Sequence, residues 1–144
     1  MFETQSNGTK QLNKHRGTES TEVKDLITEK IIGAAIEVHK ALGPGLLESV
    51  YETCLCHELQ LSGMSFERQK TLPVKYKGLR LETGLRIDIV VESTVVVELK
   101  CVENIAPVHE SQLLTYMRLS NISTGILLNF YTQRLVDGIK RMVL

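Results

Sequence analysis

Two short apolar runs near the middle of the chain, each carrying charged residues, constrain the fold most strongly. Residues 86–91 read Arg-Ile-Asp-Ile-Val-Val, and residues 95–100 read Val-Val-Val-Glu-Leu-Lys. Both runs are typical of β-strands. The three residues between them suffice for a hairpin loop, which pairs Val91 with Val95. This register predicts that Asp88 lies directly opposite Glu98.

The predicted hairpin gathers two acids and a lysine. Side chains alternate between the faces of a strand, so Glu98 and Lys100 share one face. Two carboxylates that face each other across a sheet repel, and a sequence tolerates this when a cation lies between them. Carboxylate oxygens suit Mg²⁺, and the carbonyl of Leu99 would add a ligand. The alternative is a salt bridge among Asp88, Lys100 and Arg86.

The composition indicates one soluble globular domain. The chain has 144 residues, of which 42% are hydrophobic and 24% are charged, enough for a single core. No apolar run approaches the roughly 20 residues that span a bilayer. The N-terminal residues lack the apolar segment of a signal peptide, so we expect a cytoplasmic protein without a membrane partner. The three cysteines have no metal-type spacing and are expected to be reduced thiols.

Charge is balanced over the whole chain but not along it. The formal net charge is +0, which argues against strong non-specific binding of nucleic acid. Residues 66–86 carry six basic and two acidic side chains, whereas residues 87–110 carry five acidic and one basic. A basic strand pair beside an acidic pocket suits a site that holds a cation and approaches a phosphodiester. The alternative is a solvated hairpin with ordinary surface lysines.

The order of predicted elements indicates an α/β domain. Residues 1–21 are polar and predict a flexible tail, so that the single domain comprises residues 22–144. We expect a first helix that ends at Leu42 before Gly43-Pro44-Gly45, and a second from Leu46 to Leu61. Short strands at 66–68, 72–76 and 79–81 precede the acidic hairpin, with a turn at 77–78. A helix at 108–119, a strand at 124–130 and a terminal strand follow.

Two further motifs hold candidate site residues. In Gly45-x-x-Glu48-x-x-Tyr51, Glu48 lies in the first turn of the second helix, where it either complements the helix dipole or belongs to a site. His109 and Gln112 are three residues apart at the start of a helix and share a face. His109 is a local cap or a substrate contact, and Gln112 is expected to touch Lys100 or a phosphate.

Taken together, these motifs resemble the GxxExxY family, a compact branch of the PD-(D/E)xK nuclease-like superfamily. The matching strings occur in order: Val38-His39, residues 42–52, residues 72–78, Arg86-x-Asp88, residues 97–100, residues 107–116 and residues 125–130. The resemblance implies a restriction-endonuclease-like core, a central mixed β-sheet flanked by helices. It maps the metal acids to Asp88 and Glu98, the lysine to Lys100, an additional helical acid to Glu48, and a helical glutamine to Gln112.

The resemblance implies a nuclease that uses Mg²⁺ or Mn²⁺ to hydrolyse phosphodiester bonds of DNA, or of RNA as the less favoured substrate. The alternative is a catalytically weak or inactive module on the same fold that binds nucleic acid or protein. A third hypothesis is an oligomeric protein, including a homo-oligomer, that uses the apolar strand at 126–128 or the terminal strand at a partner's sheet edge.

Overall fold

The computed structural model describes the backbone of residues 2–144 and the side chains of residues 21–82 and 84–144. The flexible tail expected over residues 1–21 falls, except for Thr21, outside the described side chains and stays a prediction. The elements in chain order are α1 (Phe2–Leu42), α2 (Glu48–Leu61), β1 (Phe66–Tyr76), β2 (Leu79–Val91), β3 (Val95–Lys100), α3 (Pro107–Ser120), β4 (Thr124–Asn129), the 3₁₀ turn η1 (Leu135–Gly138) and β5 (Ile139–Val143).

The strands form one mixed sheet in the order β1-β2-β3-β4-β5. β3 and β4 are parallel, and the other neighbours are antiparallel. The β2–β3 register pairs Val91 with Val95 and Ile89 with Val97, as the three-residue loop predicts. The α/β class with a central mixed sheet is therefore confirmed.

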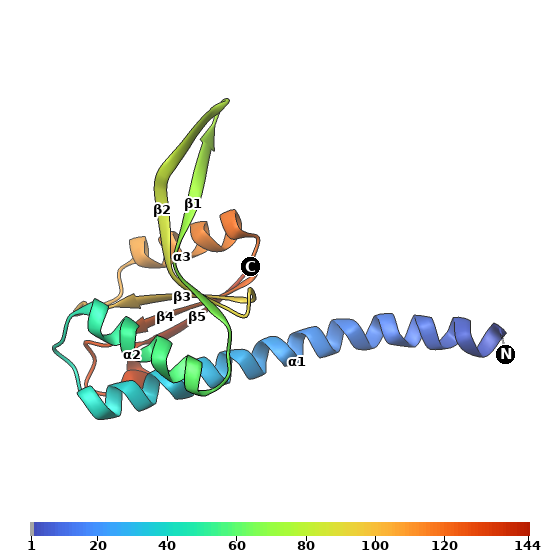
Figure 1. Ribbon diagram of the computed structural model, residues 1–144, viewed down its shortest axis with the longest axis horizontal. Helices are drawn as coiled ribbons and strands as arrows, with labels where there is room; N and C mark the ends of the chain where they lie inside the picture. Colours follow the sequence, from blue (N-terminus) through green and yellow to red (C-terminus); the bar gives the residue numbers. More distant parts are fainter. Residues whose placement is uncertain (1) are drawn as a thin grey trace.

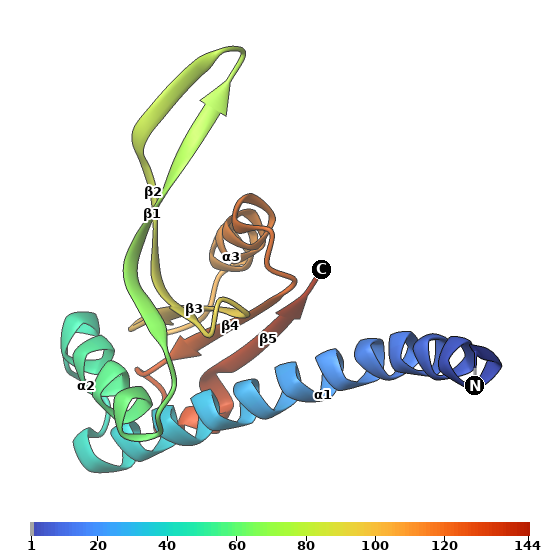
Figure 2. The same ribbon diagram turned by 45° about the vertical axis from the view of Figure 1, so that its right-hand side comes forward.

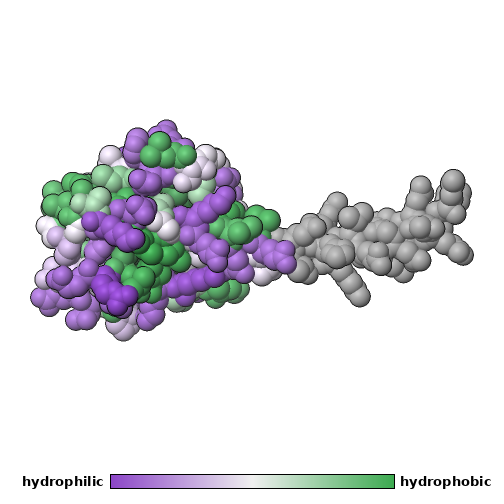
Figure 3. Space-filling view, turned by 90° about the horizontal axis from the view of Figure 1, so that it is seen from below, coloured by the Kyte–Doolittle hydropathy of each residue, from purple (hydrophilic) through white to green (hydrophobic). Residues whose placement is uncertain are grey.

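Helices cover both faces of this sheet (Figure 1). α1 and α2 lie on one face, where Val97 and Leu99 of β3 join their buried core. α3 lies on the other face, where Val96 and Leu127 pack beneath Leu113. This alternation along β3 confirms that Val97 and Leu99 point away from the face of Val96. Seen from the side of α1 and α2, apolar residues reach the surface in patches divided by polar side chains (Figure 3).

The strands before the acidic hairpin differ from the prediction. The three short strands expected there are parts of two long ones, β1 and β2, joined by the predicted turn at Lys77-Gly78, where both residues have positive φ. Figures 1 and 2 show that this hairpin rises well beyond the body of the domain. Pairing with β2 keeps Lys70 and Thr71 within strand β1, although these two residues lack the apolar alternation of a strand.

The end of the chain settles two further expectations. The terminal segment forms strand β5 at the edge of the sheet, as predicted. Residues 126–128 belong to β4, which lies between β3 and β5 and is fully buried. The hypothesis that these residues pair with a partner's sheet edge is therefore wrong, because β4 has no free edge. Within the described part of the chain, no helix has the length and apolar character needed to cross a bilayer.

Candidate active site

The site lies where β2 and β3 separate. Their backbone pairing extends to Ile89 and Val97, and beyond it carboxylates accept the backbone hydrogen bonds. The N–H of Asp88 donates to Oε1 of Glu98 at 3.0 Å, and the N–H of Leu99 donates to Oδ2 of Asp88 at 2.9 Å. The two acids therefore face each other, as the register predicts. The alternative salt bridge of Asp88 with Lys100 and Arg86 is absent from the ion pairs of the described residues.

Burial makes this carboxylate pair a strong acceptor of positive charge. Glu98 is only 4% exposed. Its burial, followed by the neighbouring charge of Asp88, raises the pKa of Glu98 to about 8, and a hydrogen bond between the two carboxyl groups acts in the same direction. Glu98 is therefore a strong acceptor of a proton or of another cation. Each carboxylate has one oxygen bound by a backbone N–H, which orients the second oxygen.

Lys100 is held beside the acids by helix α3. Its Nζ donates to Oε1 of Gln112 at 3.1 Å, and Nε2 of Gln112 donates to the hydroxyl of Tyr116 at 3.0 Å. Lys100 is half-buried, and its charge opposes the rise in the pKa of Glu98. The contact between Gln112 and Lys100 was predicted, whereas Tyr116 was not recognised in the sequence. The hydrogen bonds from Lys100 to Gln112 and from Gln112 to Tyr116 hold the ammonium group of Lys100 at the site.

The glycine-rich motif before α2 directs Glu48 toward this place. The hydroxyl of Tyr51 donates to the carbonyl of Gly43 and accepts the N–H of Leu46 at 3.1 Å. Its ring stacks on Phe130 with 4.4 Å between centroids. Tyr51 thereby fastens the turn on which α2 begins. Glu48 is exposed in the first turn of α2. Desolvation raises its pKa, the positive charge of Lys100 lowers it, and the charge of Asp88 raises it.

The structure does not bring Glu48 into direct contact with the central pair. Among the described residues, no group of three or more His, Cys, Asp or Glu side chains lies close enough to hold a metal ion together. Asp88 and Glu98 thus form the centre, with Glu48 beside it. The role of the Leu99 carbonyl as a ligand stays a prediction, and the Leu99 side chain is buried in the opposite core.

Two residues missed in the sequence support Asp88. Glu52 is buried on α2, one turn after Glu48, and binds Nε of Arg68 at 2.6 Å. Nε2 of Gln69 donates to Oε1 of Glu52 at 2.6 Å and makes a longer contact of 3.4 Å with Oδ1 of Asp88. The four-residue spacing from Glu48 could have indicated Glu52. The sequence does not indicate a role for Gln69. Its backbone is left-handed (φ 53°) inside a strand, and such a conformation depends on tertiary context.

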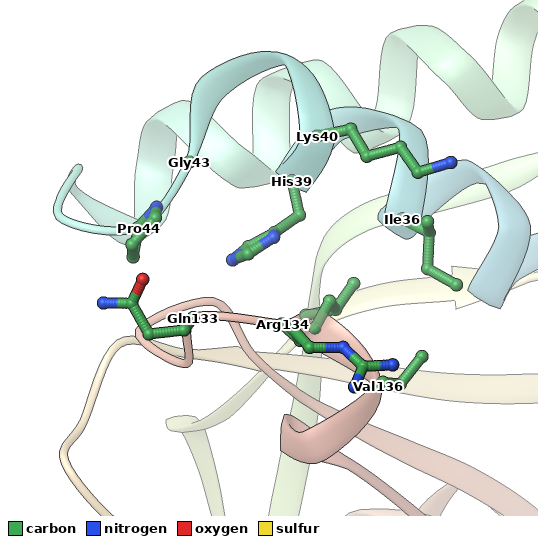
Figure 4. A pocket seen from close by; sticks show the side chains of 9 residues that line it. Ile36, His39, Lys40, Gly43, Pro44, Gln133, Arg134 and Val136 are labelled. Carbon is green, nitrogen blue, oxygen red and sulfur yellow. The ribbon is translucent and has the colours of Figure 1, made fainter.

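Other histidines and cavities have structural roles. Nδ1 of His109 accepts the N–H of Ala106 at 2.9 Å. Of the two roles expected for His109, a local cap and a substrate contact, the structure therefore shows the local cap. A cavity of about 410 Å³ lies between the end of α1 and the η1 region (Figure 4). His39 lines it and bonds through Nε2 to the carbonyl of Thr132 at 2.8 Å. None of the acids or the lysine described above lines this cavity.

Comparison with known families agrees with this geometry. The family model described as the PD-(D/E)XK nuclease superfamily matches residues 25–142. The chain belongs to the PD-(D/E)XK nuclease superfamily. No curated protein and no solved structure matches the chain. PD-(D/E)XK nucleases generally use divalent metals. The narrower GxxExxY assignment stays a prediction that rests on the sequence motifs.

Proposed function

We propose that this PD-(D/E)XK domain is a divalent-metal-dependent nuclease that hydrolyses phosphodiester bonds of DNA or RNA. The observation that carries the proposal is the pairing of the buried Glu98 with the half-buried Asp88, with Lys100 beside them. A purely structural acid pair at this position would be costly, because burial and mutual repulsion oppose its ionisation. A catalytic cation site gives these acids a reason to face each other.

The donor set fits Mg²⁺ or Mn²⁺. Both are hard cations that prefer oxygen ligands and keep several waters. Asp88 and Glu98 would hold the ion, the Leu99 carbonyl would add a neutral oxygen, and Glu48 would act directly or through a bound water. Such an ion, when present, lowers the pKa of bound water and polarises a phosphoryl oxygen.

The remaining chemistry belongs to Lys100 and its supports. A positioned ammonium group can orient the attacking water and stabilise the negative charge that develops on the phosphate. The hydrogen bond from Lys100 to Gln112 keeps Nζ of Lys100 beside the carboxyl groups of Asp88 and Glu98. Tyr116 in turn holds Gln112. Gln112 is therefore expected to position Lys100, and a phosphate oxygen that reaches the ammonium would compete with the amide for it.

Metal binding and cleavage test the proposal separately. Calorimetry with Mn²⁺ and Mg²⁺ should show a site in the wild type that Glu98→Ala abolishes. Glu103→Gln is the control, because Glu103 is an exposed acid of the same region without an ion pair among the described residues. Lys100→Ala should retain the fold and metal binding but lose about 10²–10³-fold in the rate of cleavage.

The alternative function has its own outcome in these experiments. A wild type that binds Mn²⁺ and nucleic acid but cuts neither DNA nor RNA would indicate a binding module on the nuclease fold. Equal metal binding by the wild type and Glu98→Ala would contradict the metal site itself. Circular dichroism of each variant shows whether a lost signal reflects chemistry or unfolding.

A further inference from the structure

The tip of the β1–β2 hairpin, residues 74–82, has two chemically different faces. We refer to this segment as the distal arm. Val74 pairs with Leu81, and Tyr76 pairs with Leu79, so these four side chains form one apolar face. Tyr76 and Leu79 are 62% and 56% exposed. The apolar face continues the Leu72–Leu85 pair that packs toward α3, but it extends past the helix.

The opposite face of the distal arm is basic. Lys75 pairs directly with Arg80 across the hairpin. Lys77 lies in the turn, and its Nζ is 5.4 Å from the ring centroid of Tyr76, at the border of the two faces. Like charges opposite each other weaken a strand pair. Arg80 is bridged to Glu82, whereas Lys75 and Lys77 have no acidic partner among the described residues. An anion placed on this face would balance the charge of Lys75, which no acidic side chain among the described residues offsets.

The distal arm is built to stand away from the domain. The β1–β2 register shifts between Leu72 and Val74, and a side chain at Gly84 would meet Cγ2 of Val74 at 2.6 Å. A Cβ at this position would press on the Val74 side chain, so the absence of a side chain at Gly84 suits this close approach. Figures 1 and 2 show the hairpin projecting beyond α3 in both views. The bulge therefore sets the direction of a ribbon whose tip makes no core contact.

The length of the hairpin relates its tip to the active site. Asp88 lies ten positions after Gly78, which corresponds to at most roughly 33 Å along a straight strand. One turn of B-form DNA is about 34 Å long, and its major groove admits a two-stranded β-ribbon. The major groove of A-form RNA is too deep and narrow for side chains to read.

From these observations we infer that the distal arm is a groove-binding element for duplex DNA. The basic face contacts phosphates about one helical turn from the bond held at Asp88 and Glu98, and the apolar face lies against sugars and base edges. The inference rests on the proposed function, and it narrows the substrate to B-form duplex longer than about one turn. The distal arm would then select long duplexes, and Asp88, Glu98 and Lys100 would carry out the cleavage.

A second copy of the chain is the competing occupant. Stable protein interfaces use about 20–30 residues on each side, whereas the apolar face of the distal arm offers four. The unpaired lysines also favour a polyanion over an uncharged surface. A protein partner is therefore an outcome for the experiment to detect.

Binding measured in EDTA tests the arm without cleavage. The probes are DNA duplexes of about 30 and about 8 base pairs, titrated over a range of KCl concentrations. Lys75→Glu with Lys77→Glu should lower the salt slope for the long duplex by about two units, since each phosphate contact contributes about 0.9. Lys75→Gln with Lys77→Gln should do the same. The control Lys30→Glu with Lys40→Glu makes the same charge change on exposed lysines of α1 and should leave the slope unchanged.

Four results would overturn the inference. The first is a wild type that binds long and short duplexes with the same slope, and the second is an arm variant that matches the α1 control. The third is dissociation of an oligomer by Tyr76→Ser with Leu79→Ser, seen by sedimentation, without any change in DNA binding. Because the assay contains no metal, a failure of the proposed nuclease activity leaves its readout intact. The fourth is cleavage of duplex DNA at the same rate by the wild type and the arm variants. This result would contradict the role of the distal arm but not the proposed nuclease activity.

Discussion

At the scale of single residues, several side chains in the motifs act by forming hydrogen bonds with backbone groups. Asn129 is buried at the end of β4, and its side chain binds both the N–H and the carbonyl of Val102. This anchors the chain immediately after Lys100. Tyr51 acts similarly on the turn before Glu48. Residues that touch no substrate therefore determine where the acid and the lysine lie.

The hydroxyl of Tyr51 provides a test of this positioning. Tyr51→Phe keeps the ring that stacks on Phe130 but leaves the Gly43 carbonyl and the Leu46 N–H without their partner. We expect a loss of about 1–2 kcal/mol in the free energy of unfolding, measured by urea denaturation, together with weaker Mn²⁺ binding. Tyr131→Phe is the control, because Tyr131 is exposed. Equal stability of the two variants would show that the hydroxyl does not fasten the turn.

At the scale of elements, the fit of α3 against β4 determines the position of Gln112. A side chain at Gly125 would lie 2.5 Å from Sδ of Met117 and 2.9 Å from Cδ1 of Leu113. Both contacts come from α3, so glycine at this position lets the helix approach the sheet closely. The same helix carries Gln112, which holds Lys100.

Gly125→Ala should therefore disturb both stability and the site. Overpacking of this kind costs about 1–3 kcal/mol, and an α3 displaced from β4 would move Gln112 away from Lys100. Gly33→Ala is the matched control: no atom lies within 4 Å of an added methyl group, and Gly33 is in the exposed face of α1. The control should gain about 0.5–1 kcal/mol in thermal or urea unfolding. If both variants gain stability, α3 does not pack as described.

At the scale of the whole molecule, the buried Glu98 links global stability to pH. Unfolded Glu98 releases its proton near its ordinary pKa of 4.5, whereas burial in the folded protein raises the pKa of Glu98 to about 8. Between these values the unfolded state binds fewer protons than the native state, so stability falls as the pH rises.

Unfolding free energies between pH 5 and pH 8 in EDTA measure this linkage. The metal-free wild type should lose stability progressively over the range. Glu98→Gln should show a flatter profile, because an amide stays neutral and its oxygen can still accept the N–H of Asp88. Glu103→Gln should follow the wild type, since its carboxyl group is exposed. Parallel profiles for the wild type and Glu98→Gln would mean that Glu98 ionises normally in the folded protein.

The sequence by itself determined the parts of the protein that depend on local rules. Alternating side chains and a three-residue loop sufficed to place Asp88 opposite Glu98, and Gly43-Pro44-Gly45 sufficed to end α1. Ordered motifs also indicated the superfamily that the family model confirmed.

Only the tertiary structure decided the surroundings of the acids. The left-handed Gln69, the burial of Glu52 and the separation of β2 from β3 arise where three elements meet. The length of the hairpin was missed for the same reason: polar residues such as Lys70 and Thr71 are held in β1 by pairing with β2 rather than by their own pattern. Contacts between distant residues set these features, and no local window of sequence contains both partners.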